Sequence, residues 1–331
     1  MGSFRENYTM HLLLRLLIAA AAGSWLPVAG YCQYSPPAVI KDDLIDSNAE
    51  ARAFAPGVVS SRFDEWATSF SPDNKTVYFS RGSRFWTVCF SRNRDGVWQR
   101  PEVASFSGLW RDTDPFVSPD GTKLFFTSNR PLAGAVQDKP NSNFHLWYVE
   151  QTGGDQWGRP HHVDGRVNID SNNNYAPCIS ARGTLYWCSR DREGNKGMQG
   201  YYAIWLGDHY DEPKMLHIAG VESVQDPFVS ADEKYIVFLD GSDIYVAFRQ
   251  GDGWSAARKL GPQVNTGDGN SSPYVSHDGK MLFFSSPRTK GFYDRDRSHA
   301  LNYDELEKEN DSWYNSSDNI LMIPIHFPEG M

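Results

Sequence analysis

The chain has 331 residues, of which 14% are aromatic and 22% are charged, and its formal net charge is −9. Such an acidic chain lacks the basic surface that binds nucleic-acid phosphates, so nucleic acid is excluded as a partner. The length is enough for one large core, and no apolar stretch after the first 30 residues is long enough to span a bilayer as a helix.

The first 30 residues differ in composition from the rest. From Leu12 to Gly30 the chain is apolar apart from Arg15 and Ser24, and it ends in small residues. This pattern predicts a secretory signal peptide, with an uncleaved membrane anchor as the alternative. We therefore expect a periplasmic or secreted protein with no transmembrane segment after signal removal. The predicted organisation is a signal peptide (1–30), an N-terminal extension (31–50) and one folded domain (51–331).

A short phrase then returns five times, and a β-rich run follows each copy. The serines that mark the copies are Ser71, Ser118, Ser180, Ser230 and Ser276, so the spacings are 47, 62, 50 and 46 residues. Self-similarity with a period of about 45 residues is typical of a β-propeller or a repeat array.

Each unit has the pattern of four strands. The first strand ends at the marker serine, and a Pro-Asp-Gly turn or a variant of it leads into the second. The second strands are predicted over 77–79, 124–126, 185–187, 235–238 and 282–284, and the third over 85–90, 144–149, 202–206, 244–248 and 320–325. The fourth strands are marked by Trp98, Trp157, Tyr210 and Trp254.

The fifth unit has no fourth strand, because only a few residues follow its third. The segment Arg52 to Val59 precedes the first unit and has the character of a missing strand. We expect it to pair with the last strand and close a ring. The predicted fold is therefore an all-β single propeller of five blades, with six as the alternative.

The units resemble the PD40, or WD40-like, repeats of TolB-type β-propellers. The resemblance rests on Asp114-Pro115-Phe116-Val117-Ser118-Pro119-Asp120-Gly121, and on Asp226-Pro227 followed by Asp243-Ile244-Tyr245. Ala67-Thr68 and Ala176-Pro177 depart from the Asp-Pro of the family. The resemblance implies the fold more than an activity, because envelope proteins, peptidase accessory domains and outer-membrane modules share this repeat.

In such a propeller the long insertions open on one face, around the central mouth. They connect the second and third strands of three blades, over 131–143, 191–200 and 289–318. Long loops on a rigid scaffold commonly carry function. The last insertion includes a helix-like stretch, 303–310, which could cover the mouth as a lid or be a solvated excursion.

Polar residues converge on the same face. A ring that alternates arginine with carboxylate or amide groups could recognise an anionic or polyhydroxylated ligand, since guanidinium matches carboxylate geometry. The predicted ligand-binding residues are Arg81, Arg111, Arg130, Tyr175, Arg190 and Arg288. The alternative is that the arginines and carboxylates of the repeat form structural ion pairs. Glu65, Arg111 and Tyr175 depart from the repeat and are the stronger functional candidates.

The other patterns in the sequence are weak. Asp170 to Asn174 has oxygen ligands at alternate positions but lacks the glycine and terminal glutamate of a calcium loop, so we expect no cofactor, and structural calcium is a weak alternative. Cys178 and Cys188 lie on neighbouring strands, where buried thiols are favoured over a disulfide. Neither a zinc-binding spacing nor a Gly-x-Ser-x-Gly elbow is found.

Two functions fit these observations. The first is a binding or scaffold module that holds a protein, a peptide or an envelope glycan at the mouth. The second is a glycan-active hydrolase or lyase, for which Glu65 and Asp112 are the candidate acid and base and Arg130 and Arg190 would orient an anionic group. The sequence favours binding, because no carboxylate pair stands out from the repeat.

Overall fold

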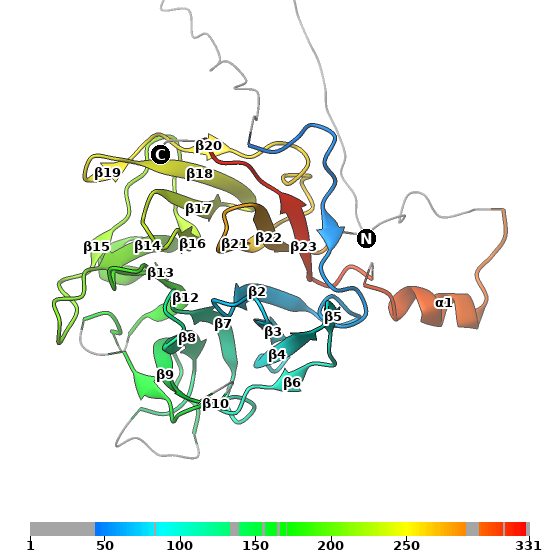
Figure 1. Cartoon of the computed structure of the whole chain (residues 1–331), viewed down its shortest axis with the longest axis horizontal. Coiled ribbons are helices and arrows are strands. Elements are labelled where there is room, and N and C mark those ends of the chain that lie inside the picture. The colour runs from blue at the N-terminus through cyan, green and yellow to red at the C-terminus, as the bar shows by residue number, and fades with distance from the viewer. Residues whose placement is uncertain are drawn as a thin grey trace, which may run out of the picture. The chain divides into compact units, whose positions relative to one another are not determined.

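The computed structural model describes residues 44–82, 84–132, 139–153, 156–163, 166–169, 171–288, 298–313 and 315–328. These residues form five antiparallel sheets, which are arranged radially about one centre (Figure 1). The first strand of each sheet lies at the centre, and the later strands follow outward. The predicted five-bladed propeller is therefore confirmed.

The blades follow the chain in order. Blade 1 contains β2 (Glu65–Phe70), β3 (Thr76–Arg81), β4 (Thr87–Arg94), β5 (Val97–Trp98) and β6 (Glu102–Val103). Blade 2 contains β7 (Asp112–Val117), β8 (Lys123–Ser128), β9 (His145–Gly153), β10 (Gln156–Trp157) and β11 (His161–His162). Blade 3 contains β12 (Asn173–Ile179), β13 (Leu185–Arg190), the short 3-10 helix η1 (Arg192–Gly194), β14 (Met198–Ala203) and β15 (Lys214–Met215).

Blade 4 contains β16 (Gln225–Val229), β17 (Tyr235–Asp240), β18 (Asp243–Gln250), β19 (Gly253–Trp254) and β20 (Arg258–Lys259). Blade 5 contains β21 (Ser271–Val275), β22 (Met281–Ser286) and β23 (Asn319–Pro324), and β1 (Arg52–Ala53) completes it. The third strand of blade 3 ends before residue 204, earlier than predicted, because Trp205 and Tyr210 already pair with each other across the next hairpin.

The ring closes as the sequence predicts. Arg52 lies opposite Met322 and Ala53 opposite Leu321, so the early strand β1 forms the outer edge of the last blade. The next residue, Phe54, packs edge-on against Phe70 of blade 1 and Phe283 of blade 5, with ring centroids 5.6 and 5.2 Å away. Burying a side chain of this size stabilises the fold by about 1.5–3 kcal/mol. The closing segment therefore joins the two ends of the chain through both backbone pairing and packing.

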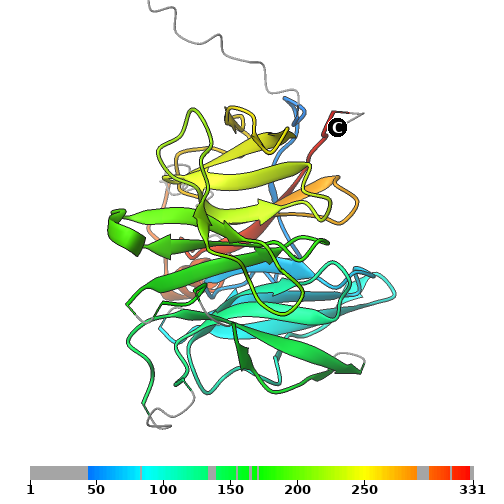
Figure 2. The ribbon, with the colours of Figure 1, turned by 90° about the vertical axis from the view of Figure 1, so that its left-hand side faces the viewer.

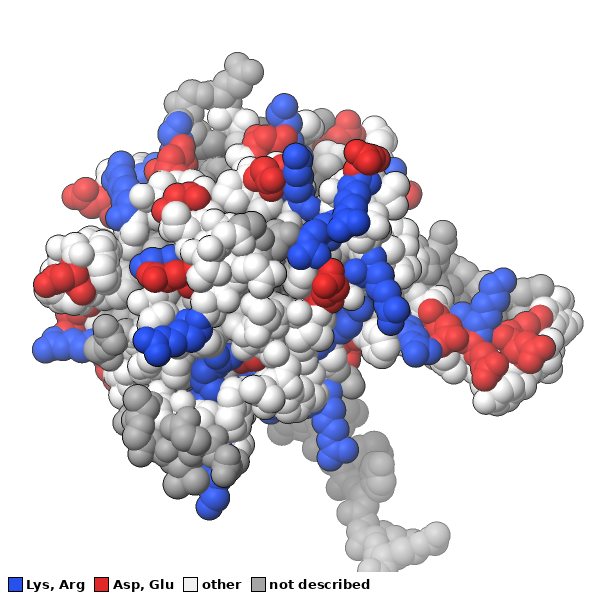
Figure 3. All heavy atoms as spheres, turned by 60° about the horizontal axis from the view of Figure 1, so that its bottom comes forward, with Lys and Arg blue, Asp and Glu red and all other residues white. Residues whose placement is uncertain are grey.

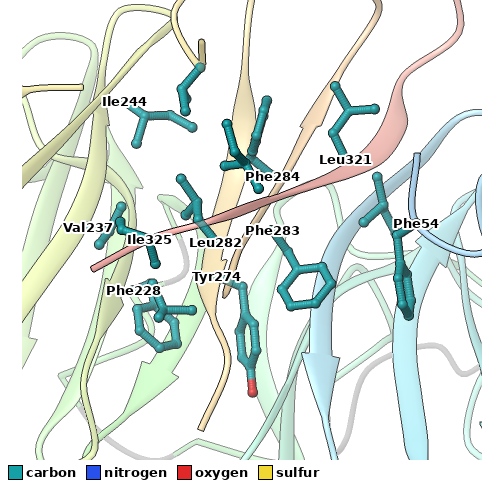
Figure 4. Close-up of a cluster of buried hydrophobic side chains, with 14 of the residues drawn as sticks. Phe54, Phe228, Val237, Ile244, Tyr274, Leu282, Phe283, Phe284, Leu321 and Ile325 are labelled. Carbon is teal, nitrogen blue, oxygen red and sulfur yellow. The ribbon is translucent and has the colours of Figure 1, made fainter. Parts of the chain in front are cut away.

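Most of the core lies between neighbouring blades. Figure 4 shows the cluster around the closure, where side chains from β17, β21 and β22 meet those of β23 and Phe54. Cys178 and Cys188 belong to this buried interior and are free thiols, as favoured from the sequence. The Sγ of Cys178 accepts a hydrogen bond from the backbone N–H of Val229 in blade 4, at 3.2 Å, so the thiol itself joins two blades.

The repeated phrase forms the turn between the first two strands. In blade 2, Ser118 donates to Asp120 at 2.6 Å, and its oxygen also accepts the backbone N–H of Lys123 at 3.0 Å. The same serine–aspartate pair occurs in blades 1, 4 and 5. Blade 3 has Arg182 at the aspartate position, and there Ser180 alone accepts the N–H of Thr184. The repeat is thus a local hydrogen-bonding device, which explains why it indicates fold better than function.

The helix α1 (Tyr303–Asn310) lies outside the ring of blades (Figure 1). It has no buried residue, and a capping box formed by Asn302 and Glu305 stabilises its first turn. Acidic side chains gather on this projection at the right of Figure 3, while charges of both signs are interspersed over the rest of that face. The helix of this insertion is therefore a solvated excursion at the side of the propeller.

Seen from the side, the blades form a stack of twisted sheets with loops on both faces (Figure 2). None of the helices in the described part of the chain has the length and apolar character needed to cross a membrane. The predicted signal peptide lies outside the described residues.

Candidate functional site

The five first strands share a break in register that shapes the central axis. At each break one residue adopts a left-handed backbone conformation, with φ between 44° and 55°. The extra residue in each bulge re-aims the neighbouring side chains, as bulges do next to functional sites. The five equivalent residues are Ala67, Asp114, Ala176, Asp226 and Ser272. Together with the residues that follow them they leave a passage of only about 40 Å³.

Above this passage the propeller opens into a cavity of about 500 Å³, here called the mouth cavity. It lies on the face where the first strands begin, which is the face predicted to carry function. Its described lining contains three half-buried aromatic residues, four aspartates and one arginine. These are Trp66, Trp86, Tyr175, Asp64, Asp114, Asp226, Asp318 and Arg190.

Three of the four predicted strand-end arginines are occupied elsewhere. Each donates to backbone carbonyls of the chain that enters its own blade: Arg81 to Val58 at 2.8 Å, Arg130 to Phe106 at 3.2 Å and Arg288 to Gln263 at 3.1 Å. None of the three lines the mouth cavity. Their geometry is that of a clip that fastens the incoming segment to the end of the second strand.

The predicted acid and base belong to two of these clips. Glu65 accepts from Arg81 at 2.9 Å and Asp112 accepts from Arg130 at 2.7 Å, and both carboxylates are fully buried. Burial raises the pKa of Glu65 to about 7, although Ser61 and Arg81 oppose the shift. Burial likewise raises the pKa of Asp112 against the opposing effect of Arg130. Neither carboxylate reaches the mouth cavity.

Blade 3 departs from this arrangement. The clip there is made by Arg192, which is 1% exposed and donates to the carbonyls of Val167 at 2.8 Å and Arg166 at 2.5 Å. Arg190, at the strand-end position, is exposed and lines the mouth cavity. Among the described residues it forms no ion pair. The sequence already contained a signal of this exchange, because a second arginine, Arg192, follows the expected Arg190 by two positions.

Aromatic side chains form one wall of the mouth cavity. Trp66 and Trp86 meet edge to face with ring centroids 6.0 Å apart, and Trp66 donates to Thr113 at 2.8 Å. The guanidinium of Arg111 lies 3.8 Å from the centroid of Trp86, so this arginine supports the wall from behind instead of lining the cavity. Trp66 and Trp86 were missed from the sequence. Trp66 occupies the position before the bulge, as Tyr175 does in blade 3, and this alignment could have identified it.

Tyr175 continues the wall on the side of blade 3. Its ring centroid lies 5.5 Å from that of Phe144, which in turn packs at a tilt against Trp86 with centroids 5.3 Å apart. Burial raises the pKa of Tyr175 to about 12, and the nearby carboxylate of Asp114 adds to the shift. The hydroxyl of Tyr175 therefore stays protonated and remains a hydrogen-bond donor at neutral pH.

The acidic groups form two pairs. Asp114 accepts the N–H of Ala176 at 3.0 Å, and Asp226 accepts that of Ser272 at 3.1 Å, so each joins its blade to the next. Burial raises the pKa of Asp114 to about 6, with a further contribution from Asp226. At the rim, the N–H of Asp318 donates to Asp64 at 3.2 Å, and burial with the charge of Asp64 raises the pKa of Asp318.

In the part of the chain that the structure describes, no three histidine, cysteine or acidic residues are placed to hold a metal ion. Asp170, the first residue of the weak calcium pattern, lies outside the described residues. Asn172 donates to the carbonyl of Arg190 at 2.9 Å and is already used in holding the end of β13.

No protein-family model matches the chain. No curated protein matches it in sequence. Among solved structures it is similar to the α-L-arabinofuranosidase of Lactobacillus brevis, with a TM-score of 0.51 and 10% identity over 82% of this chain and 92% of that one. This likeness shows the propeller fold alone.

The chain is also similar to TolB from Acinetobacter baumannii, with a TM-score of 0.44 and 18% identity. The matched region covers 80% of this chain but only 55% of that one. For the putative TolB of Agrobacterium tumefaciens the TM-score is 0.45 and the identity 15%, over 80% and 90% of the two chains. The PD40 character of the repeats stays a resemblance.

Proposed function

We propose that this chain is an exported binding module that holds a glycan in its mouth cavity. The observation that supports this most directly is the joint presence in one cavity of half-buried aromatic rings and of carboxyl groups without an arginine partner. The volume of about 500 Å³ lies within the range of about 300–1,000 Å³ that is usual for ligand sites, and it suits a short oligosaccharide.

The aromatic wall suits the apolar face of a sugar ring. Trp66, Trp86 and Tyr175 are each half-buried and present part of their rings to the cavity. Arg111 fixes Trp86 from behind, and the hydrogen bond to Thr113 fixes Trp66, so little side-chain entropy is lost when a ligand stacks on them. Rigid rings with a polar edge are efficient contact surfaces for this reason.

The polar groups suit sugar hydroxyls. Asp64, Asp226 and Asp318 offer carboxyl oxygens as acceptors, although burial raises the pKa of Asp226 and Asp318, and hydrogen bonds from hydroxyls to an ionised carboxylate are stronger than those between neutral groups. Hydroxyl donors are neutral, so they are not repelled by a cavity in which acidic groups outnumber the one arginine. Arg190 lies on blade 3, across the ring from the junction of blades 1 and 5, and supplies donors for an oxygen on the far side of the ligand.

The experiment is a binding screen of residues 31–331 against neutral and acidic oligosaccharides, followed by calorimetry on the strongest binder. Trp86→Ala should weaken binding by about 0.5–1.5 kcal/mol, or roughly twofold to tenfold, because one stacking surface is lost. Tyr303→Ala is the control, since Tyr303 is an exposed aromatic residue on helix α1, outside the ring of blades and away from the mouth cavity. Binding only to a peptide or a protein, with no glycan bound, would reject the glycan and leave a scaffold role.

A second candidate function is glycan hydrolysis, which one observation favours. Asp114 has a pKa raised to about 6 and lies near Asp226 at the floor of the cavity. General-acid catalysis of glycosidic cleavage requires a pair of carboxyl groups, one of which is kept protonated by its environment. This pair would replace Glu65 and Asp112, which are sealed in their arginine clips.

Asp114→Asn tests hydrolysis, because an amide oxygen can still accept the N–H of Ala176. If the chain is a hydrolase, the variant loses turnover and keeps its melting temperature, and wild-type turnover falls as the pH rises past about 6, where Asp114 loses its proton. Bound oligosaccharide that remains uncleaved by the wild-type chain would leave the binding module as the function.

A further inference from the structure

The seams between blades are filled by an aromatic residue that the later blade contributes from its fourth-strand position. Trp98, Trp157 and Trp254 occupy this position and pair with the preceding strand, whereas Tyr210 forms an isolated bridge with Trp205 beyond the end of β14. Between blades 1 and 2, Trp157 donates from Nε1 to the hydroxyl of Tyr78 at 3.0 Å. Both side chains are less than 10% exposed, at 8% and 2%, so this seam is closed.

The seam between blades 2 and 3 has smaller partners. Tyr210 stands where blade 2 has Trp157, and Phe125 stands where blade 1 has Tyr78. A cavity of about 310 Å³ lies here, on the face opposite the mouth cavity, and we call it the seam cavity. Its main walls are Phe125, Tyr148, Val163, Ile179, Trp205 and Tyr210.

The hairpin that carries Trp205 gives this cavity a defined outer wall. Trp205 pairs with Tyr210 across the hairpin, and their rings meet edge to face at 5.0 Å. Trp205 packs closely against Gly183. A Cβ atom placed on residue Gly183 would lie only 3.1 Å from the Cβ of Trp205. The neighbouring Ile204 and Leu206 are 41% and 57% exposed and extend an apolar rim beside the opening.

Polar side chains also reach this mainly apolar space, among them Thr122, Lys123 and Tyr210. Whereas Tyr78 receives the indole N–H of Trp157, the hydroxyl of Tyr210 has no hydrogen-bond partner among the described residues. Burial raises the pKa of Tyr210 well above its usual value, so the hydroxyl is neutral and can both donate and accept. A cavity with mainly apolar and aromatic walls and a few polar groups is the usual form of a small-ligand site.

We propose that the seam cavity binds a planar aromatic group of up to indole size that carries a hydrogen-bonding N–H or O–H. The ring would lie among Phe125, Tyr148 and Trp205, which offer both edge and face contacts, and its polar atom would meet the hydroxyl of Tyr210. The closed seam between blades 1 and 2 supplies the precedent, since the same architecture accepts an indole with an N–H···O bond there. This site is independent of the mouth cavity.

The test is a calorimetric or NMR titration of residues 31–331 with N-acetyl-L-tryptophanamide, with N-acetyl-L-leucinamide as the aliphatic comparison. We expect saturable binding of the aromatic probe and at least about tenfold weaker binding of the aliphatic one, a difference of about 1.4 kcal/mol. Comparable binding of free indole would indicate a small-molecule ligand, whereas a need for the amide groups would indicate a tryptophan in a peptide. Equal binding of the two amides, or no binding, overturns the proposal.

Two variants keep the test specific. Tyr210→Trp combined with Phe125→Tyr rebuilds the pair of the closed seam, so it should raise the melting temperature and weaken the aromatic probe by about tenfold or more. Trp205→Ala removes one wall from a partly exposed hairpin and should weaken the probe without unfolding the chain. Tyr303→Trp, on the exposed helix α1, is the matched control and should leave binding unchanged. Undiminished binding in both cavity variants would place the probe elsewhere and reject the seam cavity.

Discussion

Blades 2 and 3 share the order of their three inner strands but use their arginines differently. In blade 2 the strand-end residue Arg130 is buried against Asp112 and the carbonyl of Phe106. In blade 3 Arg192 holds the incoming chain, and the strand-end residue Arg190 is left exposed in the mouth cavity. The comparison teaches that a repeated residue first serves the cohesion of its blade. It becomes available for a ligand where a neighbour in the sequence takes over that task.

The largest expected effect comes from breaking a clip. Arg130→Ala leaves the carboxylate of Asp112 buried without its ion partner, and removal of one member of a buried pair costs about 3–5 kcal/mol. Urea unfolding should show this loss, with Arg182→Ala, an exposed arginine in a turn, as the control. Adding Asp112→Asn to the variant should recover part of the loss. A free energy of unfolding like that of the wild type would mean that the clip does not hold blade 2.

The second effect is a pH dependence that the clip of blade 1 introduces. The pKa of Glu65 is raised from 4.5 to about 7 in the folded chain, so between these values the folded state binds more protons than the unfolded state. Stability should therefore fall as the pH rises from about 4.5 to about 7 and level off above, by about 1.4 kcal/mol for each unit of the shift. Glu65→Gln should remove this part of the slope, as urea midpoints at pH 5 and pH 7.5 would show. An unchanged slope would assign the titration to other carboxylates.

The third effect tests whether Arg192 has replaced Arg190 as a clip. Arg192→Ala leaves the carbonyls of residues 166 and 167 without their donor, which should cost about 1–3 kcal/mol. Calorimetric melting of the variant beside Arg190→Ala measures the difference between the two arginines directly. Equal effects of the two substitutions would mean that blade 3 shares the task between them.

The sequence predicted the fold almost completely, because the repeat is a local device. The turn formed by Ser118 and Asp120 depends only on residues within the phrase, and the missing last strand left β1 as its one replacement. The residues that line the mouth cavity were harder to predict, because the partners of Arg81 and Arg130 are backbone carbonyls of the incoming chain. No residue type marks a carbonyl in a sequence. In the sequence, the arginines that hold the fold could therefore not be distinguished from Arg190, which faces the cavity.

Two further features depended on position within the repeat. Trp66 and Tyr175 both precede the bulge, and only an alignment of the first strands at that residue shows that both side chains face the axis. Asp318 reaches the rim at the end of an insertion, where no repeat guides the interpretation. The open seam could be anticipated from Tyr210 and Phe125, which replace a tryptophan and a tyrosine, but only after the blades are known to be neighbours.

The smallest expected change in stability is the sharpest test of the comparison between blades 2 and 3. Arg190→Ala should alter the free energy of unfolding by less than about 0.5 kcal/mol, as for most exposed positions, because Arg192 already holds the incoming chain. The same substitution should weaken an oligosaccharide bound in the mouth cavity by about 1 kcal/mol or more, since it removes the guanidinium donors and leaves only the hydroxyl of Tyr175 on the aromatic wall of blade 3. Arg190→Lys keeps the charge without the planar fork, so it should recover little of an affinity that depends on paired hydrogen bonds. A variant that unfolds easily yet binds normally would reverse the assignment and make Arg190 a structural arginine like Arg130.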